Sequence, residues 1–284
     1  MLGEPIGYLG ELGFPEALRW HKGELWFSDM FRGRVMAWVP PNPAREVIAT
    51  KNGGPEMPGG LGWLPDGRVL VVDCLEKKVL CFNPIDKSIQ LWANLSAFTN
   101  YPLNDLHVDF DGVAWVGGYG FNPDIGPIKP SPLYRITLDQ NIEQTQEYFI
   151  FPNGSERSSS GLLVAETFAD RLSILDDFGK VLLFRQLPEG SGPDGLTLGP
   201  NGSVIVALAF SGSLIICHAD GTLDNLYNAN SVQLDPKQIS FGVYDCAFDP
   251  GTNILAVASA SSDELHAEQF NTGSITLFKF ESSE

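Results

Sequence analysis

The sequence predicts an all-β protein, a six-bladed β-propeller of four-stranded antiparallel blades, and two observations carry this prediction. A hairpin unit recurs along the chain: an apolar run, a turn glycine and a second run rich in β-branched residues, seen most clearly in residues 59–73. Its repeat of 41 to 49 residues is typical of propeller blades, although a pair of β-sandwiches is an alternative. The turn glycines are Gly23, Gly67, Gly112, Gly161, Gly202 and Gly251.

The blades can be assigned in order, and together they make all 284 residues one domain. Residues 1–15 are expected to lead into the ring, and a polar connector, residues 42–58, separates blades one and two. Insertions fall in blade three, at residues 120–127, and in blade six, at residues 261–272. The final segment, residues 273–280, must close the ring against its neighbours, because an open strand edge invites aggregation.

Composition limits the partners and the compartment. The net charge is −17, from 35 acidic and 18 basic residues, which argues against binding to nucleic acid or to anionic membranes. No stretch is apolar enough for a transmembrane helix, and the N-terminus lacks the features of a signal peptide. We therefore expect a cytoplasmic protein, a monomer or weak homo-oligomer, whose four cysteines are free thiols.

Aligning the hairpins places one residue per blade at the start of the inner strand, facing the central channel. We call these six the channel-mouth residues, and a ring brings them together at one depth. Four of them carry side-chain oxygens, and two of those four are acidic. They are Glu16, Gly59, Asn104, Asn153, Asp194 and Val243.

Two carboxylates and two amides that converge on one axis would repel each other or lie unsatisfied without a partner. One divalent cation resolves both problems. All-oxygen ligation favours Ca²⁺, ahead of Mg²⁺ or Mn²⁺, and the absence of His and Cys makes Zn²⁺ the least favoured ion. The alternative is that these residues only form turns and strand ends, where Asn and Asp are common.

Several segments resemble the senescence marker protein (regucalcin)/gluconolactonase family of six-bladed propellers. The resemblance covers essentially the whole chain, with its motifs in the right order. The matching segments are residues 16–20 (EALRW), 25–29 (LWFSD), 103–105 (LND), 152–154 (PNG), 164–168 (VAETF) and 193–195 (PDG).

The resemblance implies roles for these residues. Glu16, Asn153 and Asp194 match the metal ligands of the family, and Asn104 matches the polar residue beside them. Members commonly hydrolyse lactones with Ca²⁺ or another divalent ion, which suggests a hydrolase of lactones or other carboxylic esters. The metal would polarise the carbonyl and activate water, with Asp194 as general base and Asn104 binding substrate. A calcium-binding protein without turnover, or an isomerase or cyclase using the same metal, remains an alternative, whereas a purely protein-binding propeller would not need these oxygens.

Two departures from the family pattern stand out. Pro102 occupies the place of an arginine found in members that hydrolyse sugar lactones. The strand after Asn153, residues 155–160, is polar where the family is apolar, and Arg157 at a core-type position needs a partner.

The loops expected on the channel-mouth face are rich in aromatic residues and poor in basic ones, with Arg32 and Lys129 among the few. Aromatic rings bury apolar surface but supply few partners for sugar hydroxyls. We therefore predict a lactone or ester with a hydrophobic or aromatic body. Tyr101, Tyr119, Phe121, Phe168 and Tyr244 are the rings expected to contact it, beside Asn104. Others on these loops are Phe31, Phe98, Phe210, Phe241 and Phe270.

Overall fold

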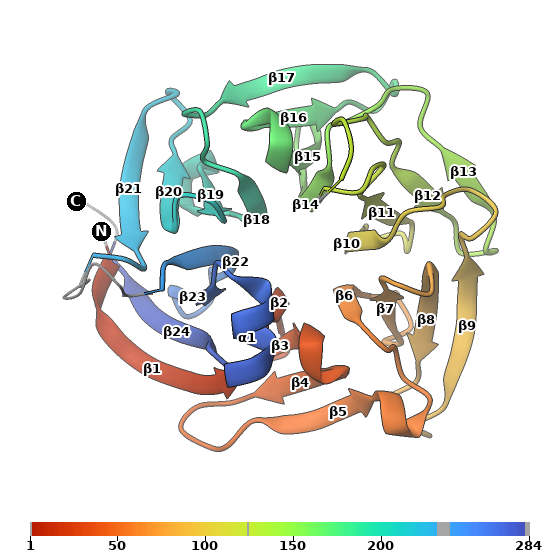
Figure 1. The fold of residues 1–284 in the computed structure, drawn as a ribbon, viewed down its shortest axis with the longest axis horizontal. Coiled ribbons are helices and arrows are strands. Elements are labelled where there is room, and N and C mark those ends of the chain that lie inside the picture. The colour runs from red at the N-terminus through yellow and green to blue at the C-terminus, as the bar shows by residue number, and fades with distance from the viewer. Residues whose placement is uncertain (1, 124, 232–238, 282–284) are drawn as a thin grey trace.

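The computed structural model describes residues 2–123, 125–231 and 239–281. Within them the strands form six antiparallel sheets of four strands each, arranged as blades around a central axis (Figure 1). The prediction of a six-bladed propeller is confirmed. No helix in the described part of the chain is both long and apolar enough to cross a membrane.

Each blade contributes one strand to each of four positions, counted outward from the axis. The first strands are β2 (Pro15–His21), β6 (Pro58–Trp63), β10 (Leu103–Val108), β14 (Pro152–Ser158), β18 (Pro193–Leu198) and β22 (Phe241–Asp249). The second are β3 (Glu24–Asp29), β7 (Val69–Asp73), β11 (Ala114–Gly118), β15 (Gly161–Glu166), β19 (Val204–Leu208) and β23 (Ile254–Ser261). The third are β4 (Arg34–Trp38), β8 (Lys78–Phe82), β12 (Tyr134–Ile136), β16 (Arg171–Leu175), β20 (Ser213–Cys217) and β24 (Gly273–Phe280). The outermost are β5 (Arg45–Ala49), β9 (Ile89–Asn94), β13 (Ile142–Gln144), β17 (Val181–Gln186), β21 (Leu223–Asn228) and β1 (Leu2–Leu12).

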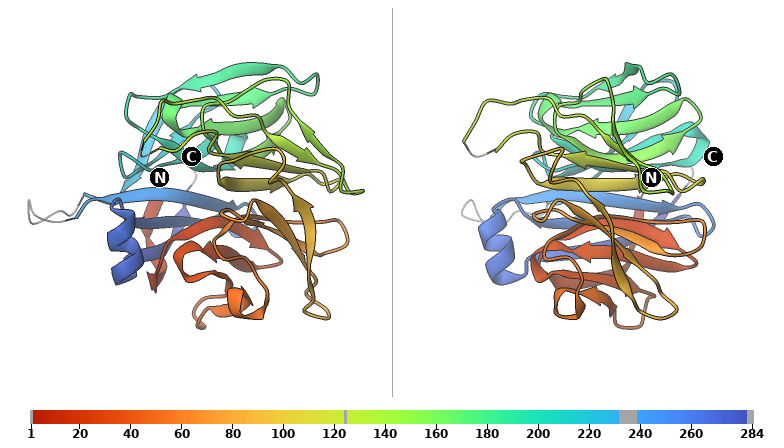
Figure 2. Two further views of the ribbon diagram at one scale, coloured as in Figure 1. Left: turned by 45° about the vertical axis from the view of Figure 1, so that its right-hand side comes forward. Right: turned by 90° about the vertical axis from the view of Figure 1, so that its right-hand side faces the viewer.

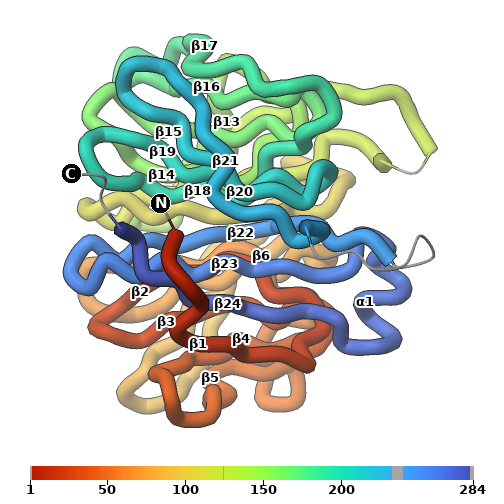
Figure 3. Tube along the Cα trace, turned by 90° about the vertical axis from the view of Figure 1, so that its left-hand side faces the viewer, coloured from red at the N-terminus to blue at the C-terminus, as the bar shows by residue number. Residues whose placement is uncertain are grey.

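The N-terminal strand closes the ring. β1 pairs with β24 from Leu2 opposite Phe280 to Leu12 opposite Gly273, so the sixth blade contains both ends of the described chain (Figure 3). The expectation that residues 1–15 only lead into the ring was wrong. Pairing with β1 satisfies the backbone groups of β24 that would otherwise form an open edge.

The prediction of a connector at residues 42–58 was also wrong in part, because this segment contains β5, the outermost strand of blade one. Arg45 and Glu46 are exposed, and only Ile48 and Ala49 are buried. A strand with one short buried end has too little apolar alternation to be recognised in the sequence.

The hairpin turns follow the predicted chemistry in five blades. Gly67 has φ of +89°, and Gly23, Gly112, Gly161 and Gly202 also have positive φ. In the sixth blade Gly251 does not have a positive φ, and Asn253 adopts the left-handed conformation instead, with φ of +54°. Asparagine is among the few residues with a side chain that tolerate this conformation.

Every first strand changes register against its second strand near its beginning, for example between Pro193 and Leu196 in blade five. The same irregularity occurs in the other five blades. Such bulges re-aim side chains. At this point neighbouring strands approach closely: a Cβ on Gly60 would lie 1.9 Å from the Leu106 nitrogen. The bulges therefore fix both the spacing of the strands around the channel and the direction of the residues at its mouth.

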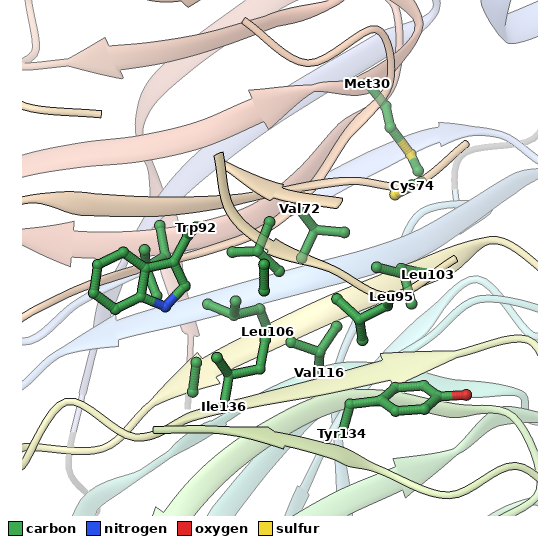
Figure 4. Close-up of a cluster of buried hydrophobic side chains, with 14 of the residues drawn as sticks. Met30, Val72, Cys74, Trp92, Leu95, Leu103, Leu106, Val116, Tyr134 and Ile136 are labelled. Carbon is green, nitrogen blue, oxygen red and sulfur yellow. The ribbon is translucent and has the colours of Figure 1, made fainter. Parts of the chain in front are cut away.

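Apolar side chains fill the space between blades. The largest cluster includes Val72 of β7, Leu106 of β10, Val116 of β11 and Ile136 of β12, all nearly or fully buried (Figure 4). Burial of apolar surface stabilises a fold by about 25 cal/mol per Å². The ring is therefore held mainly by contacts between adjacent blades, which leaves the channel free for polar groups.

Arg157 has the partner that its core-type position requires. Its Nε and Nη2 lie 2.7 and 2.6 Å from the two carboxylate oxygens of Asp109, and its guanidinium stacks over Trp115 at 5.8 Å. Trp115 also donates its indole N–H to Asp109 at 2.7 Å. Burial would raise the pKa of Asp109, but the hydrogen bonds from Arg157 and its neighbours outweigh it and hold that pKa well below its usual range. The polar strand β14 thus joins blade four to blade three.

The two predicted insertions project from the same face of the ring. The insertion in blade six forms helix α1 (Glu264–Phe270), and the insertion in blade three is the long loop between β11 and β12 (Figure 2). The guanidinium of Arg32 hydrogen-bonds to Asn271 Oδ1 at 2.6 Å and to the Glu268 carbonyl, which anchors the end of α1 to blade one.

Candidate functional site

Four oxygen-bearing side chains occupy the same position in four blades. Glu16, Asn104, Asn153 and Asp194 are each the second residue of a first strand, in β2, β10, β14 and β18. In three of these strands proline comes first, a position where a missing ladder N–H does no harm. Because the first strands surround the axis, the four residues lie at one end of the central channel.

Asp194 carries the plainest sign of a missing partner. The residue is 6% exposed, and its Oδ1 has no hydrogen-bond partner in the part of the chain that the structure describes. Leaving a buried acceptor unsatisfied costs about 1–3 kcal/mol, and more for a charged group. Each such atom in a native protein calls for an explanation, and a bound ion is one.

Asn153 is held by its amide nitrogen. Its Nδ2 donates to Thr167 Oγ1 at 3.2 Å, and that hydroxyl donates to the Pro193 carbonyl at 2.8 Å. Asn153 is 7% exposed. With the nitrogen engaged, the amide oxygen is the atom available for a cation, and the same chain of hydrogen bonds ties Asn153 to the residue before Asp194.

The pKa values of the two acidic members are both raised, and that of Glu16 is raised in part by the charge of Asp194. Burial raises the pKa of Glu16 well above its usual value, and the Asp194, Asp245 and Asp105 carboxylates raise it further. Burial also raises the pKa of Asp194, together with Asp245, Asp105 and Glu264. Carboxyl groups in this situation resist ionisation unless a positive charge joins them.

These residues fit a divalent cation. They offer two carboxylates and an amide oxygen at one channel mouth, the hard oxygen donors that Ca²⁺ prefers, and one of those oxygens is buried without a partner. Among the described residues no three or more His, Cys, Asp or Glu side chains form a metal-binding group. The set of Glu16, Asn153 and Asp194 contains two acidic residues and one amide, so it does not form a group of three His, Cys, Asp or Glu residues.

A second polar layer lies beside these residues, and sequence analysis did not find it. Arg19 places Nη2 3.0 Å from Asp105 Oδ2 and Nη1 3.5 Å from Asp245 Oδ2. The Asp245 carboxylate also accepts the Leu18 backbone N–H at 2.5 Å. Burial, opposed by Arg19 and reinforced by Asp105, raises the pKa of Asp245 to about 7. One sequence feature could have indicated this second layer: an acidic residue directly follows the channel-mouth position, as Asp105 follows Asn104.

The sixth blade differs from the prediction by one residue. Val243 is fully buried in an apolar cluster with Ile205 and Cys246, and its strand changes register between Val243 and Asp245. In blades two to five the register shift begins directly before the channel-mouth residue, so that the residue preceding it is the last one paired. In blade six the last paired residue before the shift is Val243. Tyr244, not Val243, therefore takes the channel-mouth position in this blade.

A pocket of about 1210 Å³ lies on the face that carries both insertions. Of the six residues predicted to bind substrate, Tyr101, Tyr119 and Phe121 line it; Asn104, Phe168 and Tyr244 do not. Glu16, Asn153 and Asp194 are also absent from its lining. The pocket is walled by blades one, two and three and by the segment from Ser262 to Glu268.

Tyr119 links this pocket to the channel mouth. It lines the pocket, yet burial and the charges of Cys74, Glu264, Asp194 and Glu16 raise the pKa of its hydroxyl. It therefore lies close enough to both acidic channel-mouth residues to sense their charge. Like any tyrosine hydroxyl at neutral pH it is protonated, and hence able to donate a hydrogen bond.

Phe168 and Tyr244 belong to the packing around the mouth. Phe168 lies 5.4 Å from Phe121 and 5.5 Å from Phe210, measured between ring centroids. Tyr244 packs on Phe14 at 4.4 Å, with its hydroxyl 3.4 Å from the Ser261 carbonyl. Burial and the Asp194 charge raise the pKa of Tyr244, which places it near the acidic pair.

Comparisons with known proteins agree with this architecture. The family model described as SMP-30/Gluconolactonase/LRE-like region matches residues 14–248. A search of curated proteins found no match.

Three solved structures of similar shape share little sequence identity with the chain. A luciferin-regenerating enzyme superposes with a TM-score of 0.73 at 19% identity, covering 96% of this chain and 93% of that one. A calcium-binding protein, regucalcin, from Agrobacterium tumefaciens gives 0.72 at 16%, covering 96% of each chain. A gluconolactonase from Xanthomonas campestris gives 0.70 at 16%, covering 98% of this chain and 90% of the other. At these identities the likeness shows the fold alone.

Proposed function

Because the chain belongs to the SMP-30/Gluconolactonase/LRE-like family, we propose that it is a metal-dependent hydrolase of lactones or other cyclic esters. Glu16, Asn153 and Asp194 would hold one divalent cation, Ca²⁺ in the first place. The observation that carries this proposal is the buried, unpartnered Oδ1 of Asp194 at the same channel mouth as Glu16. A cation there would give that oxygen a partner and neutralise both acids.

A bound cation would supply a Lewis acid for the ester carbonyl and lower the pKa of a water molecule. Asp194 would accept the proton of that water as general base, a role suited to the ionised carboxylate that a bound cation favours. Asn153 would keep its oxygen in place through Thr167, and Tyr119 would donate a hydrogen bond to a substrate oxygen from the pocket side.

We propose a substrate with an apolar body in preference to a sugar lactone. Its lining includes Met30, Met57, Phe31 and Phe121, and Pro102 stands where sugar-lactone hydrolases of this family carry arginine. Each sugar hydroxyl buried here without a partner would cost about 1–3 kcal/mol. An alkyl or aryl group would instead gain about 25 cal/mol per Å² of buried surface.

The test begins with metal analysis of the purified protein, followed by a panel of aryl, alkyl and sugar lactones with and without chelator. We expect hydrolysis that chelator abolishes and Ca²⁺ restores, with kcat/KM highest on the apolar lactones. Asp194→Ala should lose this activity and remain folded. Full activity in Asp194→Ala, or in chelator, would refute the mechanism. Equal or better turnover of gluconolactone would refute the substrate preference.

A calcium-binding role without turnover is the second candidate. The same three oxygens would bind the ion, and the structurally similar regucalcin is described as a calcium-binding protein. The panel separates the two roles: bound Ca²⁺ that depends on Asp194, with no lactone hydrolysed, would favour this candidate. Conversion of a substrate without hydrolysis would instead indicate an isomerase or cyclase that uses the same site.

A further inference from the structure

We propose that the pocket selects a cationic substrate, an apolar lactone or ester that carries an amine or quaternary ammonium group. This inference rests on the proposed function for the pocket's role as the substrate site. It adds the charge of the substrate to its apolar character. The evidence is the set of side chains around the cavity.

The charged side chains of the pocket are all acidic. Glu56 comes from the connection between blades one and two, and Asp263 and Glu268 come from the segment that contains α1. Glu264 also lines the pocket. No Lys, Arg or His stands among the lining residues that the structure describes. An anionic substrate would therefore meet repulsion from several sides of the cavity.

Arg32, which sequence analysis placed among the basic groups near this face, is directed elsewhere. Its guanidinium hydrogen-bonds to Asn271 and to the Glu268 carbonyl at the end of α1. Its positive charge is thereby committed to holding the helix, and the residue does not line the pocket. The field inside the pocket is set by carboxylates.

The pocket wall suits an organic cation better than a metal ion. Glu56 and Glu268 are exposed and come from different parts of the chain, and aromatic and methionine side chains share the lining with them, including Phe31, Tyr101 and Tyr119. Aromatic faces attract alkylammonium groups, and choline-type ligands are bound in this way. A volume of about 1210 Å³ exceeds what a small hydrated ion needs and accommodates a ligand of drug size.

The acidic lining of the pocket includes the segment that contains α1. Glu264, in the first turn of that helix, and Tyr119 both line the cavity. A cation bound in the pocket would be attracted by this same group of acids. An ester anchored by its ammonium group would thus have its carbonyl end directed toward Tyr119 and the channel-mouth residues.

Unreactive ligands test this selectivity without turnover. We would titrate 4-phenylbutyl-trimethylammonium, 4-phenylbutan-1-ol and 4-phenylbutanoate into the Ca²⁺-loaded protein by calorimetry at low ionic strength. The ammonium should bind about five- to tenfold more tightly than the alcohol, and the carboxylate most weakly. Raising the salt to 0.5 M should reduce the difference. Equal binding of all three, or tightest binding of the carboxylate, would overturn the proposal.

Charge-neutral variants locate the effect. The double variant Glu56→Gln/Glu268→Gln should lose most of the preference for the ammonium and keep its affinity for the alcohol. Glu4→Gln, an exposed position of the outer strand β1, serves as the matched control and should behave as the wild type. A preference that survives the double variant, or that Glu4→Gln also removes, would contradict the assigned pocket.

The outcome is separable from that of the proposed function. Selective ammonium binding by a protein that hydrolyses no lactone would support the pocket and refute the hydrolase. Hydrolysis of neutral lactones with no preference for the ammonium ligand would support the hydrolase and refute the cationic substrate.

Discussion

At the scale of single residues, the site combines groups that oppose folding with groups that compensate for them. Asp194 and Glu16 are acids whose burial raises their pKa values, and neither has a basic residue among the groups that perturb it. Asp105 and Asp245 differ, because Arg19 contacts both. Arg19 therefore supplies positive charge to Asp105 and Asp245 but not to Glu16 and Asp194. Two acids without a basic partner are what a cation site requires.

Because Asp194 has no basic partner, replacing it should make the metal-free protein more stable and should remove the stabilisation by Ca²⁺. In chelator, Asp194→Asn should raise the free energy of unfolding by about 1–2 kcal/mol, because it removes a buried acid without a partner. In Ca²⁺ at 100 times its Kd the wild type should gain about 2.7 kcal/mol, and the variant little or none. Urea denaturation under both conditions measures this. A variant less stable than the wild type in chelator would contradict it.

The same acids predict a pH dependence of the metal-free protein. A carboxyl whose pKa is higher in the folded state than in the unfolded state binds more protons when folded. Glu16, Asp194 and Asp245, the last with a pKa of about 7, should therefore stabilise the fold as pH falls from 7.5 to 6. We expect Tm in chelator to rise by a few degrees over this interval.

Saturating Ca²⁺ should flatten or reverse this dependence, because it favours the ionised acids. The Asp194→Asn variant in chelator should show a smaller rise than the wild type, and this comparison cancels the other titrating groups. Differential scanning fluorimetry gives both curves. A wild-type Tm that falls on acidification in chelator, with the same slope in the variant, would contradict the raised pKa values.

At the scale of elements, the bulge at the start of each first strand determines which channel-mouth residues could be predicted from the sequence. The periodic hairpins located Glu16, Asn104, Asn153 and Asp194 correctly at the starts of their strands, since motif spacing within a blade is local. Tyr244 was predicted to contact substrate, but the channel-mouth position of blade six was assigned to Val243, because a one-residue register change has no sequence signature there.

Contacts between blades explain the other omissions. The Arg19 contacts with Asp105 and Asp245 join positions 86 and 226 residues apart, and only the closed ring brings them together. The Arg157–Asp109 pair is similar, because neither residue signals its partner along the chain. Strand propensity and turn chemistry act over a few residues, so the sequence predicted the blades better than the links between them.

The link between blades three and four can be tested. Arg157→Ala leaves the Asp109 side chain, 9% exposed, without its bidentate partner. Because Arg157 is itself 29% exposed, the expected loss is about 2–3 kcal/mol, below the 3–5 kcal/mol of a fully buried pair.

Arg135→Ala is the matched control. Arg135 also lies over Trp115, at 6.0 Å, but its partner Glu143 is 51% exposed. The expected loss is below about 1 kcal/mol. Guanidinium chloride denaturation compares the two, and equal losses would show that the buried pair is not what joins the blades.

At the scale of the whole molecule, ring closure makes the N-terminal strand part of the last blade. Leu9 and Leu12 of β1 pack in the same apolar cluster as Ile275 and Leu277 of β24. Removing residues 1–12 should uncover this apolar surface and the edge of β24. We expect the truncated chain to aggregate or to lose its cooperative unfolding transition.

A circular permutant separates the role of the strand from the role of its position in the chain. Leu2 pairs with Phe280, so a short Gly/Ser linker can join the two ends of the described chain. New termini can be opened in the β8–β9 turn at Asp86–Lys87, which is exposed. Because every blade is kept, this permutant should keep the oligomeric state of the wild type, lie within about 1–2 kcal/mol of its stability, and bind the same Ca²⁺. Gel filtration, urea denaturation and calcium titration check these outcomes; a permutant that aggregates as the truncation does would show that stability depends on chain order and not on closure by β1.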